Sequence, residues 1–259
     1  MKLLAAFALT TIVLSLPAQR KTYILVHGAW HASWCWDKVV PLLESKGHSV
    51  TALDLPGHGR DTSNIGRVTL DQYVRKVVMA CNATSEKVVL VGHSMAGVVI
   101  AQAAEELGPE KVSKLIFLDA FMPRSGESVL SLAEKAAKIG EQQGPGLLPN
   151  LILSEDQKTS TVSTDAVESL FYHDCSPQDV AFAKEHVGPQ PMICLATPVK
   201  LTDARYGSIS KNYILCTKSN DLDKTSIAIN VPIEKLFKLE SSHSPFFSMP
   251  EKLVEILLK

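Results

Sequence analysis

The sequence has few of the features that would tie a protein to nucleic acids or to a membrane surface. Its formal net charge is −1 over 259 residues, and the charged residues, 20% of the total, form no long run of one sign. Binding to a nucleic acid or to an anionic membrane depends on a basic patch or stripe, so we expect neither partner. The chain also shows no internal repeat and no low-complexity stretch. With 46% hydrophobic residues, its length suits one α/β domain or one domain with an insertion.

Metal-binding cysteine patterns are absent as well. The five cysteines show neither C-x-x-C spacing nor a cysteine–histidine ligand pattern, and we therefore expect no metal and no cofactor. An odd number cannot pair completely within one chain. We expect most of them to be small buried side chains; an exported chain would have room for one or two disulfides. They are Cys35, Cys81, Cys175, Cys194 and Cys216.

The N-terminal residues resemble a targeting segment. A positive start at Met1-Lys2 is followed by an apolar run from Leu3 to Leu16 and by small residues over 17–19. The run is too short to span a bilayer, but it suits the hydrophobic part of a signal peptide. We therefore predict that residues 1–19 are a signal peptide and that the mature protein is periplasmic or secreted. The alternative is a buried first strand or helix.

Apolar runs and helical patterns alternate along most of the chain. The expected strands cover residues 22–26, 49–53, 88–91, 112–118, 211–216 and 233–239. The expected helices cover residues 36–46, 70–81, 98–106 and 250–258. This alternation predicts the α/β class, with a mostly parallel central sheet flanked by helices.

The alternation stops between residues 124 and 204. This segment is richer in Gly, Pro, Ser, Glu and Gln and contains helical stretches over 128–139 and 177–185. We predict a helical cap insertion over 124–204, lying above the carboxyl ends of the strands. The core would then comprise residues 20–123 and 205–259.

One short motif indicates the chemistry. Residues 92–97, GHSMAG, follow an apolar run and precede a helical stretch. A serine on a sharp strand-to-helix turn is the arrangement of a nucleophile elbow. A serine hydroxyl is a weak nucleophile until a neighbouring base activates it, and the turn exposes the hydroxyl to that base. We therefore predict that Ser94 is the nucleophile.

The base and the acid should follow later strands, because active groups of open α/β sheets sit at the carboxyl ends of strands. His243 lies on a polar loop just after the last expected strand and is the candidate base. The acid is less defined. Asp221 is the first choice, Asp223 the second and Asp119, at the end of an earlier strand, the third; the sequence leaves all three open.

The remaining site predictions concern the substrate. The backbone amides of Ala29 and Met95 are assigned to the oxyanion hole, where such donors stabilise a tetrahedral intermediate. Trp30, Phe121 and Phe246 are expected to form an apolar substrate pocket, which suits small hydrophobic esters.

Several motifs together resemble a known superfamily. They are VHGAWH at 26–31, LDLPGHG at 53–59, VGHSMAG at 91–97, LDAFMP at 118–123 and the segment 172–184. They are similar to the α/β-hydrolase superfamily, in the branch that holds plant methylesterases, hydroxynitrile lyases and similar bacterial esterases. The resemblance implies the α/β-hydrolase fold, a cap over a Ser–His–Asp triad, and hydrolysis of small esters without metal or cofactor.

Two departures from this branch bear on function. In the family the acid closely follows a Cys-Thr pair, and that position falls here near Ser219, so Asp221 is a shifted match. The lyases carry an acidic residue before the serine and a lysine after the histidine, where this chain has His93 and Ser244. We therefore predict a serine esterase acting on small apolar esters.

Two other functions stay open: a carbon–carbon lyase, and a non-catalytic ligand sensor on a hydrolase shell. The expected partners are a small-molecule ester and, as a homodimer, a second copy of the chain. We expect no stable membrane insertion.

Overall fold

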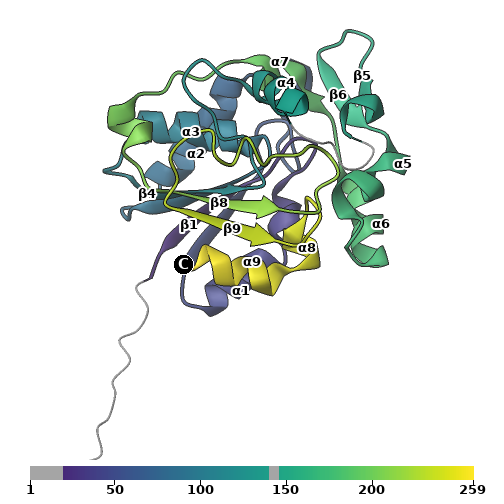
Figure 1. Ribbon diagram of the computed structural model, residues 1–259. Coiled ribbons are helices and arrows are strands. Elements are labelled where there is room, and N and C mark those ends of the chain that lie inside the picture. The colour runs from purple at the N-terminus through teal and green to yellow at the C-terminus, as the bar shows by residue number, and fades with distance from the viewer. Residues whose placement is uncertain (1–19, 140–145) are drawn as a thin grey trace, which may run out of the picture.

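A computed structural model describes residues 20–139 and 146–259 (Figure 1). Its centre is a six-stranded sheet in the order β2-β1-β3-β4-β8-β9, and every neighbouring pair is parallel. The strands are β1 (Thr22–Val26), β2 (Ser49–Leu53), β3 (Val88–His93), β4 (Val112–Leu118), β8 (Lys211–Cys216) and β9 (Lys235–Leu239). All six agree with the predicted strands to within two residues. The predicted signal peptide, 1–19, lies outside the described residues and stays a prediction.

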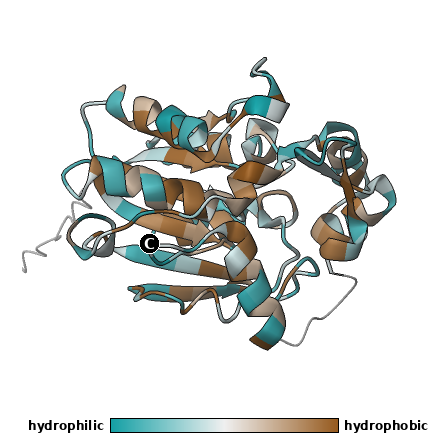
Figure 2. Ribbon diagram, turned by 90° about the horizontal axis from the view of Figure 1, so that it is seen from above, coloured by the Kyte–Doolittle hydropathy of each residue, from teal (hydrophilic) through white to brown (hydrophobic). Residues whose placement is uncertain are grey.

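The inner strands are buried on both sides. Every residue of β1, β3 and β8 is buried, as expected where helices cover both faces of a parallel sheet. Seen from above, the strands are largely brown, for hydrophobic residues, and teal residues gather on the outer helices (Figure 2).

Helices cover both faces of the sheet (Figure 1). On one face, α1 (Val39–Ser45) packs against α9 (Pro250–Leu257). On the other, α2 (Leu70–Asn82) packs against α3 (Ala96–Leu107). The predicted helix over 36–46 begins later than expected, at Val39, because a 3₁₀ turn, η1 (Ser33–Trp36), precedes it.

The insertion forms a separate layer beside the strand ends (Figure 1). Its helices and helical turns are α4 (Val129–Ile139), η3 (Leu148–Asn150), α5 (Thr164–Val167), η4 (Glu168–Tyr172), α6 (Pro177–His186), α7 (Met192–Ala196) and η5 (Asp203–Gly207). The predicted helical cap also contains a small sheet, which the sequence analysis did not anticipate. β5 (Leu151–Leu153), β6 (Thr159–Val162) and β7 (Gln190–Pro191) form a three-stranded antiparallel sheet. In β6, half-buried threonines alternate with buried residues, a pattern that suits a short strand.

Two short elements complete the list of helices. They are η2 (Ile65–Arg67) and α8 (Pro245–Ser248). All five cysteines are unpaired, and four of them are buried, in keeping with the prediction of small buried side chains. Within 20–139 and 146–259, no helix combines the length and the apolar character needed to cross a bilayer.

Candidate active site

Three strand ends carry unusual backbone angles. Trp30, Ser94 and Asp119, just past β1, β3 and β4, have φ values of 63°, 53° and 42°. They are three of the four non-glycine residues with positive φ in the described part of the chain. Such conformations are costly and cluster at functional sites. Because these three strands are neighbours in the sheet, the strained residues mark one edge of the molecule.

The turn that holds Ser94 has no room for larger neighbours. A Cβ atom on Gly97 would lie 2.2 Å from the backbone oxygen of Phe121, and one on Gly28 would lie 2.9 Å from Cβ of Ser94. The turn is fixed from β4 as well, since the amide of Ser94 donates to Leu118 O and the amide of Phe121 donates to Ser94 O. The sequence therefore forms the strand–turn–helix that the GHSMAG motif predicts.

His243 lies on the loop between β9 and α8 and is held from two sides. Its Nδ1 hydrogen bonds to Oδ2 of Asp119 at 2.7 Å, and its backbone oxygen lies 2.9 Å from Nε2 of His93. The rings of His93 and His243 are 4.4 Å apart. Burial lowers the pKa of His93 well below its usual value, so His93 is neutral and its Nε2–H donates to that carbonyl. His93 thus links the elbow to the loop of the candidate base.

The structure selects among the three candidate acids. Asp119 accepts the hydrogen bond from His243, whereas the nearest oxygen of Asp221 is 3.7 Å from the same Nδ1. Asp223 accepts from the amide of Thr225, two residues further along its own loop. The preference for Asp221 is therefore corrected: Asp119, the third choice, contacts the imidazole.

Asp119 is buried and fully hydrogen bonded. Its Oδ1 accepts from the amide of Cys216 at 3.2 Å, and its Oδ2 also accepts from Ser219 Oγ at 2.6 Å and from Lys224 Nζ at 3.1 Å. Burial alone would raise the pKa of Asp119, but the Lys224 charge and the His243 hydrogen bond outweigh it and hold the pKa below its usual value. Asp119 is therefore ionised at neutral pH.

Sequence reasoning missed two of these partners. Ser219 could have been singled out, because the related family has its acid near this position. Lys224 carried none, because a lysine in a polar loop predicts a solvated side chain. Asp119, Asp221 and His243 lie close enough together to suggest a metal site. The ammonium of Lys224, which bonds both carboxylates, stands where a cation would bind, so this donor set does not fit a metal.

An apolar cavity of about 400 Å³ opens beside Ser94. Its wall contains the predicted residues Ala29, Trp30, Met95 and Phe121. The amides of Ala29 and Met95 donate to no protein acceptor in the described ranges, which leaves both available for an oxyanion. Further lining residues come from the cap and the loop after β8: Val129, Leu130, Ala133, Ala137, Gly146, Leu147, Leu148, Pro149, Leu151, Met192, Leu195, Asp221 and Leu222.

Phe246 lies elsewhere than predicted. It is fully buried, its ring stands edge-on to His93 at 5.0 Å and packs against Trp36, and it does not line this cavity. Phe246 therefore packs against His93, which in turn contacts the loop of the candidate base. Leucines of the cap form the wall in its place.

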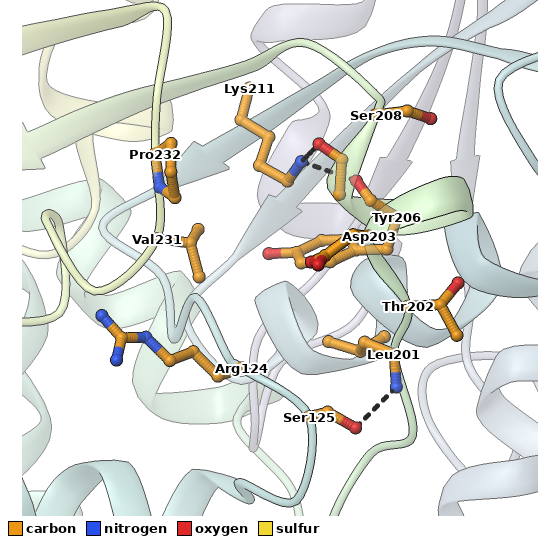
Figure 3. A pocket seen from close by; sticks show the side chains of 11 residues that line it. Arg124, Ser125, Leu201, Thr202, Asp203, Tyr206, Ser208, Lys211, Val231 and Pro232 are labelled. Atoms are coloured by element: carbon orange, nitrogen blue, oxygen red, sulfur yellow. Dashed lines mark hydrogen bonds between the residues drawn. The ribbon is translucent and has the colours of Figure 1, made fainter.

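A second cavity, of about 520 Å³, lies away from Ser94 (Figure 3). Lys211 extends toward the carbonyls that end η5, and Nζ donates to the backbone oxygens of Tyr206, Gly207 and Ile209. Burial lowers the pKa of Lys211 to about 8. With its hydrogen bonds directed to the backbone, this lysine has a structural role, and the cavity contains no nucleophile–base pair.

Comparison with known proteins agrees with this geometry. Residues 23–256 match the model of the alpha/beta hydrolase family. The chain belongs to the alpha/beta hydrolase family. This alpha/beta hydrolase is 33% identical to Methylesterase 9 of Arabidopsis thaliana, over 92% of its own length and 97% of that protein. It is 32% identical to Salicylic acid-binding protein 2 of Nicotiana tabacum, over 92% and 96% of the two chains.

Some relatives are longer. The chain spans 63% of the length of Putative methylesterase 11, chloroplastic, of Arabidopsis thaliana, to which it is 34% identical over 92% of its own length. Among solved structures, it matches polyneuridine aldehyde esterase with a TM-score of 0.80 and 27% identity, over 93% of this chain and 98% of that one. These names support the expectation of a carboxylic ester hydrolase.

Proposed function

We propose that this alpha/beta hydrolase cleaves small, largely apolar carboxylic esters through an acyl-enzyme on Ser94. Ser94 Oγ attacks the ester carbonyl while Nε2 of His243 accepts its proton. The amides of Ala29 and Met95 bind the oxyanion. His243 then protonates the leaving alcohol, and a water molecule repeats the sequence to release the acid.

The observation that carries this proposal is the contact between His243 and Asp119 beside the strained Ser94. An ionised carboxylate on Nδ1 fixes the imidazole tautomer, so that Nε2 is left to accept a proton. In the described residues, Ser94 Oγ makes no hydrogen bond, and its rotation toward the imidazole is the movement that the first step requires. Such bonds often form fully only when substrate is bound.

The cavity supports the substrate class. Apolar side chains dominate its wall, and the cap leucines supply much of it. Each methylene that enters such a pocket contributes about 0.8 kcal/mol, or roughly fourfold in affinity. We therefore expect kcat/KM to rise from acetate to butyrate and hexanoate esters.

The lyase and the sensor remain the alternatives. The lyase is less favoured, because His93 donates to the backbone of His243 and carries no acid function. A sensor would give one slow turnover and a ligand-dependent change in thermal stability, in contrast to repeated rapid turnover.

The test is substitution of the nucleophile. Ser94→Ala should abolish hydrolysis of p-nitrophenyl acetate and p-nitrophenyl butyrate, followed by release of p-nitrophenol, because no oxygen nucleophile remains. Ser208→Ala, at an exposed serine of the second cavity, is the matched control and should retain full activity. Wild-type turnover by the Ser94→Ala protein would refute the mechanism.

A further inference from the structure

A lysine lies completely buried behind the candidate triad. Lys224 is 1% exposed, and its Nζ contacts Oδ2 of Asp119 at 3.1 Å and both oxygens of Asp221 at 2.8 and 2.7 Å. Burial of an ammonium is costly unless it is paired. Burial alone would lower the pKa of Lys224, but the two carboxylates outweigh it and raise the pKa. The lysine is therefore charged.

The two carboxylates compete for one imidazole nitrogen. Oδ2 of Asp119 is 2.7 Å from Nδ1 of His243, and Oδ1 of Asp221 is 3.7 Å from the same atom. A shift of about 1 Å would give Nδ1 to Asp221. What opposes that shift is Lys224, since both oxygens of Asp221 are already bonded to its ammonium.

We propose that Lys224 is a positioning residue of this site: it holds Asp221 away from His243 and cancels one of two carboxylate charges, so that Asp119 alone pairs with the base. The inference rests on the proposed function. In this proposal Lys224 determines which carboxylate pairs with His243. It also sets the pH range in which His243 is unprotonated and can accept a proton.

Among the residues that the structure describes, no other group near His243 adds a charge that would compete with Asp119, Asp221 and Lys224. His93 from β3 and His31 from the loop after β1 face the same region, and burial lowers the pKa of both, that of His31 to about 4. Both are neutral near pH 7. On the cap side the apolar ring of Phe171 packs against His243 itself, and Phe246 on α8 packs against His93. Asp174 reaches only the backbone of the loop, at the amide of Ser242.

Removal of the lysine should change two measurable properties. In Lys224→Met, two uncompensated carboxylates stabilise the imidazolium, so the acidic limb of the pH–rate profile should move up by about one pH unit or more. Asp221 also becomes free to accept from Nδ1. Asp119→Asn should then cost at least about tenfold less in the Lys224→Met background than in the wild type, because a second acid can replace the first.

The experiment measures the rate at which a fluorophosphonate probe modifies Ser94, between pH 5 and 9. Oγ forms a bond to phosphorus, fluoride leaves and the proton passes to His243, so the rate reports the free base without knowledge of the natural ester. Lys211→Met is the matched control: it removes another buried lysine, far from the imidazole, and should leave the profile in place. Lys224→Arg keeps the charge and should keep the wild-type midpoint.

Two further variants cover the case in which Lys224→Met does not fold. Asp221→Asn/Lys224→Met removes both charges of the pair and should return the midpoint to the wild-type value. Asp221→Asn alone leaves the ammonium less compensated and should shift the midpoint to lower pH. Midpoints that coincide in all folded variants, or an undiminished cost of Asp119→Asn without Lys224, would overturn the inference. Equal labelling of wild type and Ser94→Ala would instead overturn the proposed function.

Discussion

At the scale of single residues, the acid of the site is the main departure from expectation. Asp119→Asn keeps the shape of the side chain but removes the charge that fixes the imidazole tautomer. We expect kcat to fall about 10³–10⁴-fold, as for comparable changes in serine hydrolases. Asp221→Asn should cost far less, because that carboxylate bonds Lys224 instead of His243. Steady-state kinetics on p-nitrophenyl butyrate at pH 8 measures both.

The reverse order of effects would return the role to Asp221. Circular dichroism of each variant separates lost catalysis from lost folding, which matters because Asp119 also bonds Ser219 and Lys224. The sequence could not rank these acids. All three follow strands, and all lie between Ser94 and His243 in the chain. Each of them therefore fits the expected chain order of nucleophile, acid and base. The backbone of Asp119 has a positive φ, and this conformation depends on the folded structure, so the sequence does not reveal it.

At the scale of elements, the loop after β1 joins the core to the cap. Trp30 Nε1 lies 3.2 Å from the backbone oxygen and 3.3 Å from Oγ of Ser160 on β6, and the amide of Gly188 donates to Trp30 O at 2.9 Å. The indole also lines the cavity and stacks on Phe171 at 6.2 Å. Trp30 therefore holds the cap sheet over the substrate cavity.

Trp30→Phe should loosen this connection while keeping an aromatic wall. The lost hydrogen bond is worth about 1 kcal/mol, so we expect KM for butyrate esters to rise severalfold with little change in kcat. Trp34→Phe is the control, since Trp34 lies outside this cavity and packs near Phe182 and His186. A fall in kcat with unchanged KM would show that Trp30 acts on the chemistry instead of on the cap.

The core elements could be predicted because their signals are local. Most central strands are short apolar runs between turn residues, and the covering helices carry local start or stop signals, such as Pro250 at the start of α9 and the capping box of Thr69 and Gln72 on α2. The cap sheet could not. β7 has two residues and β5 three, which is too short to show a hydrophobic period. β7 also pairs with a strand about thirty residues earlier in the chain. Phe246 was misplaced for a similar reason, since an aromatic residue near a base suits either a pocket or a core.

At the scale of the whole molecule, a group of buried histidines makes stability depend on pH. His27, His31, His58 and His93 are all buried. Burial is the first cause that lowers the pKa of each, to about 4 for His31 and His58. They form two ring pairs: the rings of His27 and His58 are 4.9 Å apart and those of His31 and His93 are 5.8 Å apart. Protonation of any one requires a charge in the core.

We therefore expect the free energy of unfolding to fall as the pH drops from about 6.5 toward 4. The unfolded chain takes up protons on these histidines near 6.5, but the folded protein does so only near 4 or below, so acid favours the unfolded state in that window. Each group with a folded pKa of about 4 contributes at most roughly 3 kcal/mol. Asp119 adds to the loss only below about 4, where its unfolded form begins to bind a proton. Urea titrations at pH 7, 6, 5 and 4.5 measure the slope.

A pair of substitutions separates this effect from general acid instability. His58→Gln keeps a polar partner for the hydroxyl of Tyr73, which lies 2.6 Å from Nε2 of His58, but removes one titrating ring. It should lower stability at pH 7 and flatten the fall between pH 6.5 and 4. His186→Gln removes an exposed ring at the end of α6 and should leave the slope as it is. If both variants keep the wild-type slope, the pH dependence arises elsewhere. If His58→Gln alone flattens it, the buried histidines of the core limit the stability of the fold in acid.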